Sequence, residues 1–171
     1  MATKSKAKGN AFEIKLSKEL SQWMFNDPNI LWRDSTSGGR KVIYNGDIIP
    51  AQVDKFPWST WPFIIEAKHG YKEFIPTLMN QNKVRFWLSK LMDELTESQY
   101  IPILIAKFHN QSSILITTIP LNVYCDISMN VIHESKNTSY IYYVYDYNRV
   151  ISTPFTKAMP VDLCEYLITK G

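Results

Sequence analysis

Apolar residues recur at different spacings along this chain, and each spacing predicts a different kind of element. Residues 9–25 and 78–97 have apolar positions three or four apart, which predicts two amphipathic helices. The apolar face of the first helix would consist of Phe12, Leu16, Leu20 and Trp23. Thr77 stands where it would cap the second. A closing helix is expected over residues 162–170.

Between the helices, short runs rich in β-branched and aromatic residues predict strands. These runs cover residues 30–32, 42–44, 48–49, 63–65, 101–106, 114–118 and 140–147. The run Phe63-Ile64-Ile65 is apolar throughout, as expected of a central strand covered on both faces. Residues 120–137 match neither pattern and receive no predicted element. The order of elements predicts an α/β fold in which a central mixed β-sheet is flanked by helices.

The size and composition of the chain fit one globular domain inside a cell. A chain of 171 residues, 45% hydrophobic, is long enough for a single core. No apolar run approaches the ~20 residues of a membrane helix, and no apolar stretch follows the basic start as it would in a secretory signal. Two cysteines are too few for a disulfide framework. We therefore expect an intracellular, cytoplasmic protein with no membrane segment.

The positive charge of the chain is concentrated in its first half. Residues 1–85 carry 13 Lys and Arg against 8 Asp and Glu, a charge of +5, whereas residues 86–171 carry 6 against 8, a charge of −2. A polyanion such as DNA would be attracted to the first half. A solvated surface with uneven charge is the alternative explanation.

The first half also contains a set of residues suited to phosphodiester chemistry. Glu66 and Lys68 follow the apolar strand directly, and side chains two residues apart on a strand project from the same face. Asp47 precedes Glu66 by nineteen residues, and Glu13 lies on the first predicted helix. Carboxylate oxygens, with the carbonyl of Ala67, are ligands of the kind that Mg²⁺ prefers. Lys68 would hold or deprotonate the attacking water. An ion pair at the rim of the sheet is the simpler alternative for Glu66 and Lys68.

The order of these motifs resembles the PD-(D/E)-x-K nuclease superfamily and, within it, archaeal-type and phage Holliday junction resolvases. The matching residues are Lys8-Gly9, Phe12-Glu13, Arg33, the loop 35–39, Asp47-Ile48 and the run from Ile64 to Lys68. The resemblance covers roughly residues 8–107. It implies a restriction-endonuclease-like fold and metal-dependent hydrolysis of DNA. The glycine- and serine-rich loop favours junction cleavage over other substrates.

The resemblance also implies roles for individual residues. The metal site would consist of Glu13, Asp47, Glu66 and the carbonyl of Ala67, with Lys68 as the catalytic lysine. Ser35 or Ser37 would supply a hydroxyl near the scissile phosphate, and Gln81 would lie beside the active site. Contacts to DNA are expected from Lys8, Arg33, Ser35, Arg40, Lys41 and His69.

Two features depart from the superfamily pattern. Gly46 replaces the proline of the Pro-Asp element, and the spacing from Asp47 to Glu66 is long for a hairpin. The segment between them contains Asp54, only twelve residues before Glu66, which is an alternative to Asp47 as the metal ligand. We favour Asp47, because Ile48 and the isoleucine after it look like a strand that would hold its carboxylate in place.

The candidate residues and the resemblance together predict a Mg²⁺-dependent endonuclease, with Mn²⁺ as a substitute. The resemblance implies that it resolves Holliday junctions, for which a homodimer is expected. Its Lys-, Asn-, Ile- and Tyr-rich composition is compatible with a phage origin. One nuclease domain would span residues 1–171: a flexible basic arm over 1–8, a nuclease core over 8–107 and a C-terminal extension over 108–171. The alternatives are a nuclease of the same superfamily that acts on other DNA in restriction, repair or end processing, and a non-catalytic DNA-binding module.

Overall fold

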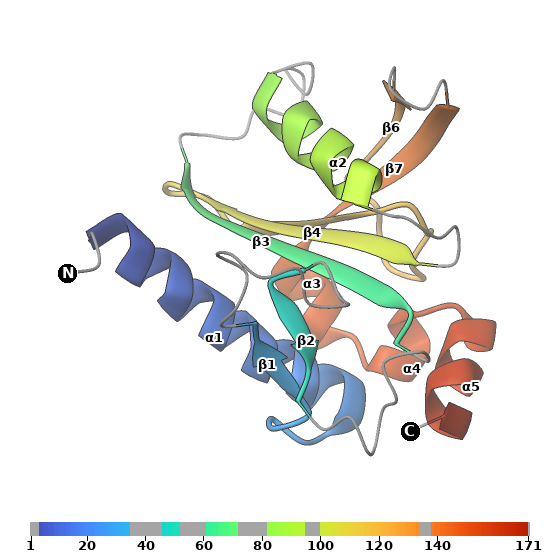
Figure 1. Cartoon of the computed structure of the whole chain (residues 1–171). Helices are drawn as coiled ribbons and strands as arrows, with labels where there is room; N and C mark the ends of the chain where they lie inside the picture. Colours follow the sequence, from blue (N-terminus) through green and yellow to red (C-terminus); the bar gives the residue numbers. More distant parts are fainter. Residues whose placement is uncertain are drawn as a thin grey trace.

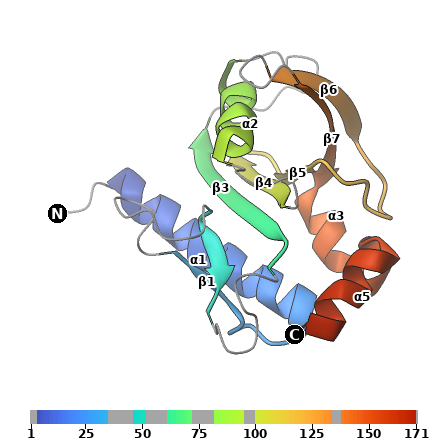
Figure 2. The same cartoon turned by 45° about the vertical axis from the view of Figure 1, so that its right-hand side comes forward.

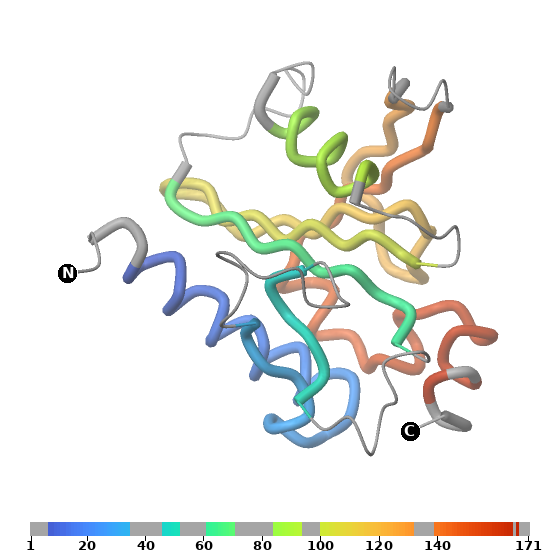
Figure 3. Tube along the Cα trace, in the orientation of Figure 1, coloured from blue at the N-terminus to red at the C-terminus, as the bar shows by residue number. Residues whose placement is uncertain are grey.

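The protein, seen here in a computed structural model, is described over residues 4–34, 46–51, 61–71, 82–94, 100–133 and 138–170 (Figure 1). Figure 3 traces the path of the chain through its elements. In chain order these are α1 (Lys4–Phe25), β1 (Leu31–Arg33), β2 (Ile48–Pro50), β3 (Phe63–Tyr71), α2 (Asn82–Glu94), β4 (Ile101–Phe108), β5 (Ser113–Thr117), β6 (Ile127–His133), β7 (Thr138–Asp146), α3 (Tyr147–Ser152), α4 (Phe155–Ala158) and α5 (Val161–Lys170).

The strands of the described residues form one seven-stranded sheet in the order β1-β2-β3-β4-β5-β7-β6. The central pair β3 and β4 is parallel, and the other neighbouring pairs are antiparallel. The parallel pair is joined through α2, as a parallel connection requires. This arrangement confirms the predicted α/β fold with a mixed central sheet.

Helices cover both faces of the sheet (Figures 1 and 2). On one face α1 packs its buried Leu16 and Leu20 with Ile65 of β3 and with residues of α3, α4 and α5. On the other face Leu88 of α2 packs with Ile64 of β3 and with residues of β4 and β7. Alternate residues of β3 thus enter two separate cores, which explains why the start of this strand is apolar throughout.

The strand β1 is anchored on α1 through a buried hydroxyl. Ser21 is fully buried, and its Oγ accepts hydrogen bonds from the amides of Ile30 at 2.9 Å and Leu31 at 3.1 Å. The burial of this serine hydroxyl is therefore explained by the backbone donors that it satisfies. This contact sets the position of β1 against α1.

Several boundaries differ from the sequence predictions. The first helix begins at Lys4 and not at residue 9, so the prediction of an arm outside the helix is wrong for residues 4–8. The strand predicted over 63–65 continues to residue 71, and β6 lies within the segment 120–137, which had no predicted element. Thr77 and the strand predicted over 42–44 lie outside the described residues. Among the described helices, none is long and apolar enough to cross a membrane.

Candidate active site

The candidate site lies at Asp47, beside the point where β2 and β3 pair. Within the described residues their ladder is limited to the pair Ile48 and Ile65. The amide of Asp47 donates to the carbonyl of Ile65 at 2.8 Å, and its Oδ2 accepts from the amide of Ala67 at 2.9 Å. The carboxylate of Asp47 thus accepts the hydrogen bond that, in a regular ladder, the amide of Ala67 would donate to a backbone carbonyl of the neighbouring strand.

Gly46 allows this close approach. Its φ is +144°, and a Cβ at this position would lie 3.1 Å from the carbonyl oxygen of Ile65 and 3.3 Å from its nitrogen. Proline, whose ring holds φ near about −65°, cannot adopt this conformation. The replacement of the superfamily's proline by Gly46 therefore follows from the local backbone and leaves Asp47 beside β3.

Glu66 and Lys68 point to the α2 face of the sheet. Side chains alternate along β3, so these two residues share the face of Ile64, which packs against α2. They form an ion pair in which the side chains of Lys68 and Glu66 are only 21% and 16% exposed. The sequence predicted that they would share a face, and the structure confirms it.

The carboxyl of Asp47 lies in an unfavourable place for a negative charge. Burial raises its pKa from 3.8 to about 7, and the charges of Glu66 and, more weakly, Glu13 add to the increase. The hydrogen bond from Ala67 and the charge of Lys68 oppose it. The structure therefore brings Asp47, Glu66 and Lys68 together, with Glu13 near enough to influence Asp47.

Glu13 itself is held on the α1 side of the sheet. It accepts a hydrogen bond from Nε of Arg33, whose Nη2 donates to Oδ1 of Asn10 at 3.1 Å. Arg33, predicted as a DNA contact, is thus engaged in an ion pair between β1 and α1. In the described parts of the chain, no three side chains of His, Cys, Asp or Glu form a group that could hold a metal ion. The expected grouping of Glu13 with Asp47 and Glu66 around one ion is therefore absent there.

Two other predicted DNA contacts, Lys8 and His69, lie on the α1 side. The ring of His69 packs on Phe12 with centroids 5.0 Å apart. Burial lowers the pKa of His69, and the charges of Lys8 and Lys107 lower it further. Lys107 had no predicted role. Only the parallel register of β3 and β4, which places it opposite His69, reveals that it belongs to this basic cluster.

A comparison with known families identifies the group to which this arrangement belongs. The family described as "Phage putative PDDEXK endonuclease" matches residues 4–165. The chain is a member of this phage endonuclease family. No curated protein and no solved structure matches it.

Membership of the PDDEXK family agrees with the fold and defines the class of activity. A mixed sheet flanked by helices is consistent with the restriction-endonuclease-like fold of PDDEXK proteins. The family is one of nucleases, for which DNA is the implied substrate, and PDDEXK nucleases generally use divalent metal ions. The coarse prediction of a phage nuclease is therefore confirmed.

The described donors fit a small hard cation beside the point where β2 and β3 pair. Because the N–H and C=O of one strand residue point to the same neighbouring strand, the carbonyl of Ala67 faces the side of Asp47, as its amide does. Two carboxylates and a carbonyl are oxygen donors of the type that Mg²⁺ takes, with water completing its octahedron. The raised pKa of Asp47 also indicates a site in which a positive charge would be favourable.

The remaining predicted site residues lie outside the described residues. They are Ser35, Ser37, Arg40, Lys41, Asp54 and Gln81. The choice between Asp47 and Asp54 as a ligand therefore stays a prediction, as do the roles of the loop serines.

Proposed function

We propose that this chain is a Mg²⁺-dependent DNA endonuclease that cuts branched DNA, with the four-way junction as its principal substrate. The observation that carries the proposal is the position of Asp47 and Glu66 beside Lys68, next to the point where β2 and β3 pair. Burial and mutual repulsion raise the pKa of Asp47 to about 7, an arrangement that is unfavourable without a cation. Membership of a PDDEXK endonuclease family supports this reading of the three residues.

Asp47, Glu66 and the carbonyl of Ala67 would hold the cation, with Mn²⁺ able to replace Mg²⁺. The chemistry that such a cation supplies is activation of water and neutralisation of charge on the phosphate. Lys68 would orient the attacking water, whose oxygen bonds to phosphorus as the bond to the 3′ oxygen breaks. The products are a 5′-phosphate and a 3′-hydroxyl, as the resemblance to junction resolvases implies.

Glu13 and the basic residues would act around this centre. Glu13 would contribute to a second cation or through a water, and its pairing with Arg33 keeps it in position until then. The cluster of Lys8, His69 and Lys107 would contact phosphates. Ser35 or Ser37, with Arg40 and Lys41, would contact DNA from the loop after β1.

The preference for branched DNA is supported by the resemblance of residues 8–107 to junction resolvases. Symmetric resolution of a junction requires two cuts related by a two-fold axis, so we expect a homodimer. A phage enzyme of this kind would act on recombination or repair intermediates in the host cytoplasm.

The decisive experiment compares cleavage of a labelled four-way junction, a flap and a linear duplex that share one sequence. Each substrate is incubated with Mg²⁺, with Mn²⁺ and with EDTA. We expect the junction to be cut fastest and only with a divalent cation. A junction that is bound but never cut with any divalent cation would refute the proposal. If the duplex is cut as fast as the junction, the proposed nuclease activity is supported but the proposed preference for branched DNA is wrong.

Variants in the same assay test the residues. Glu66→Ala should abolish cleavage and retain junction binding, because it removes a proposed ligand. Asp47→Asn should do the same, whereas Asp54→Asn should retain cleavage. The reverse result for the two aspartates would transfer the ligand role to Asp54.

A further inference from the structure

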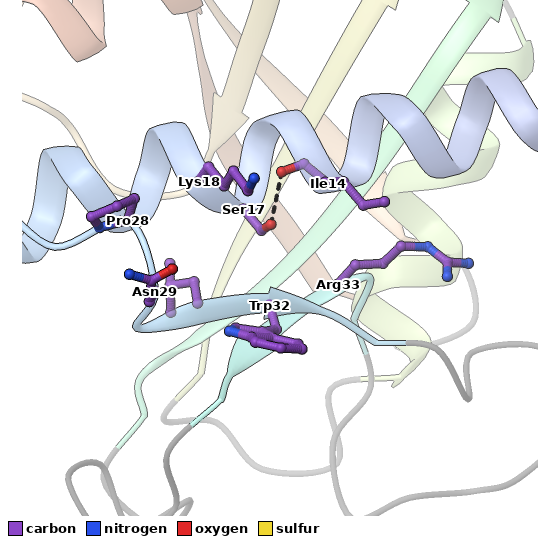
Figure 4. A pocket seen from close by; sticks show the side chains of 8 residues that line it. Ile14, Ser17, Lys18, Pro28, Asn29, Trp32 and Arg33 are labelled. Carbon is purple, nitrogen blue, oxygen red and sulfur yellow. Dashed lines mark hydrogen bonds between the residues drawn. The ribbon is translucent and has the colours of Figure 1, made fainter.

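A groove of about 440 Å³ lies between α1 and β1, at the edge of the sheet (Figure 4). Ile14 and Lys18 line it from α1, and Trp32 and Arg33 line it from β1. The turn between the two elements closes one end. We refer to it as the α1–β1 groove.

Trp32 is unusually exposed for a tryptophan. Trp32 is 60% exposed, whereas its neighbour Leu31 is 1% exposed and belongs to the core. Ile14, on the opposite wall, is 47% exposed. Tryptophan is highly buried on average, so an exposed indole in a concave surface indicates a partner that covers its ring.

The charge of the groove indicates what kind of partner this is. Among the described residues that line it, Lys18 and Arg33 are the charged ones, and none is acidic. Arg33 is paired with Glu13, but Lys18 is exposed and has no hydrogen-bond or ion-pair partner in the described parts of the chain. An aromatic platform beside an available cation suits single-stranded nucleic acid, in which bases stack and phosphates need neutralising.

Trp32 links the α1–β1 groove to the candidate active site, because it leaves β1 on the face of the sheet opposite α1, which is the face of Glu66. Trp32 pairs with Ile49, and Ile48 pairs with Ile65, so Trp32 lies on the same face of the sheet as Glu66. Two strand spacings of about 4.8 Å separate β1 from β3, a distance of about 10 Å. The amide of Asp34, two residues after Trp32, donates to the carbonyl of Asp47 at 2.9 Å. A DNA strand that crosses the candidate site toward the sheet edge would therefore meet Trp32.

We infer that the α1–β1 groove binds an unpaired nucleotide of the substrate, with its base stacked on Trp32 and an adjacent phosphate held by Lys18. This inference rests on the proposed function and adds to it the recognition of a single-stranded segment beside the cut. Stacking tolerates any base, because every base has a π face. The groove would therefore select DNA by its lack of pairing and not by its sequence.

The test measures binding of the full chain to a fluorescein-labelled single-stranded oligonucleotide and to its duplex, by anisotropy with EDTA present. We expect Trp32→Ala to weaken single-strand binding by about 5- to 150-fold, the range for loss of one stacked base. Trp32→Phe should retain most of the affinity, and duplex binding should be unchanged for both variants. Tyr124→Ala is the matched control, since Tyr124 is 73% exposed and precedes β6 at the opposite edge of the sheet.

A salt titration separates the two contacts. Lys18→Gln should lower the slope of log K against log salt by about 0.7 for single strands, the value for one phosphate contact. Trp32→Ala should lower the affinity without changing this slope. The two variants would then report a phosphate contact and a stacking contact in one groove.

Three results would overturn the inference: wild-type protein that does not bind the single strand, Trp32→Ala protein that binds it normally, and a Trp32→Ala change from dimer to monomer in sedimentation. The last result would assign the groove to a second copy of the chain.

Cleavage of the junction is measured on the same samples. If wild-type protein cuts DNA while Trp32→Ala binds normally, only this inference fails. If nothing is cut while Trp32→Ala loses single-strand binding, stacking stands and the proposed function fails.

Discussion

Two ion pairs lie at the candidate active site, and they are equally exposed but differently built. In both the Lys68–Glu66 pair and the Arg33–Glu13 pair, the basic side chain is 21% exposed and the acidic one 16%. Lys68 and Glu66 are two residues apart on β3, whereas Arg33 joins β1 to Glu13 of α1. The Lys68–Glu66 pair is local, because both residues belong to β3. The Arg33–Glu13 pair is long-range, because it joins β1 to α1.

This difference suggests different roles for the two pairs: catalysis for Lys68 and Glu66, and the positioning of α1 against β1 for Arg33 and Glu13. The local pair can open without moving any backbone, so its groups are available for a cation, a water and a phosphate. Opening the long-range pair would leave α1 and β1 with one polar link fewer and would free Glu13. We therefore expect changes in the first pair to alter catalysis and changes in the second to alter stability.

The largest expected effect is on catalysis. Lys68→Ala should reduce junction cleavage by about 10²- to 10⁴-fold, the usual contribution of a positioned acid or base. Its unfolding free energy should change much less than its cleavage rate, by about 1 kcal/mol, because the partly buried Glu66 loses its partner but no link between elements is broken. Single-turnover cleavage and urea unfolding measure the two effects. Lys15→Ala, which removes an exposed ion pair on α1 with Glu19, is the control and should change neither. If Lys68→Ala cleaves the junction normally, the Lys68–Glu66 pair has no catalytic role and does not differ from the Arg33–Glu13 pair in this respect.

The next effect is a pH dependence of stability that originates at Asp47. Because folding raises its pKa from 3.8 to about 7, the folded state binds the proton more tightly. The contribution of Asp47 to stability is full below about pH 4 and is lost as the pH rises to about 7, by roughly 1.4 kcal/mol per unit. Asp47→Asn should remove this loss. Urea unfolding from pH 4 to 8 with EDTA measures it.

Mg²⁺ provides a complementary measurement. At pH 8 it should raise the melting temperature of the wild type more than that of Asp47→Asn, because a ligand of the folded state stabilises it by mass action. Identical pH curves for the two proteins without metal would show that Asp47 keeps an ordinary pKa.

A smaller effect is expected at Gly46, which allows Asp47 to approach β3. Gly46→Ala should destabilise the fold by about 1–3 kcal/mol, since it adds a strained φ and a contact with the Ile65 backbone. Gly70→Ala is the matched control: its φ is +85°, but a Cβ there meets nothing within 4 Å. Thermal unfolding should show the larger loss for Gly46→Ala, with cleavage reduced only in that variant. Equal losses would mean that the contact with Ile65 is unimportant.

The smallest effect is expected from the long-range ion pair. Arg33→Ala should destabilise the fold by about 1 kcal/mol, because it leaves a half-buried Glu13 without its main partner. Lys15→Ala again serves as the control for an exposed pair, for which about 0.3–0.5 kcal/mol is usual. A loss no larger than that of the control would show that the Arg33–Glu13 pair does not link α1 to β1 energetically.

Much of the fold was predictable because its signals are local. The helical spacing of Leu16 and Leu20 and the apolar run at Phe63–Ile65 depend only on neighbouring residues, and both became core elements. The strand β6 was missed although Ile127, Met129 and Val131 alternate with polar residues, and all three pack into the core beneath α2. This alternation is short, and its exposed positions are those expected of an edge strand, so it is a weaker signal than the apolar run of a central strand.

The sequence by itself determined the parts of the site that lie within one element. The two-residue period of a strand places Glu66 and Lys68 on one face whatever surrounds them. The tertiary structure alone decided that the carboxylate of Asp47 meets the amide of Ala67, that Glu13 pairs with Arg33, and that the exposed Trp32 lines a groove together with Lys18. These contacts join residues from different elements, and they depend on how strands pair and helices pack, which no short stretch of the chain encodes.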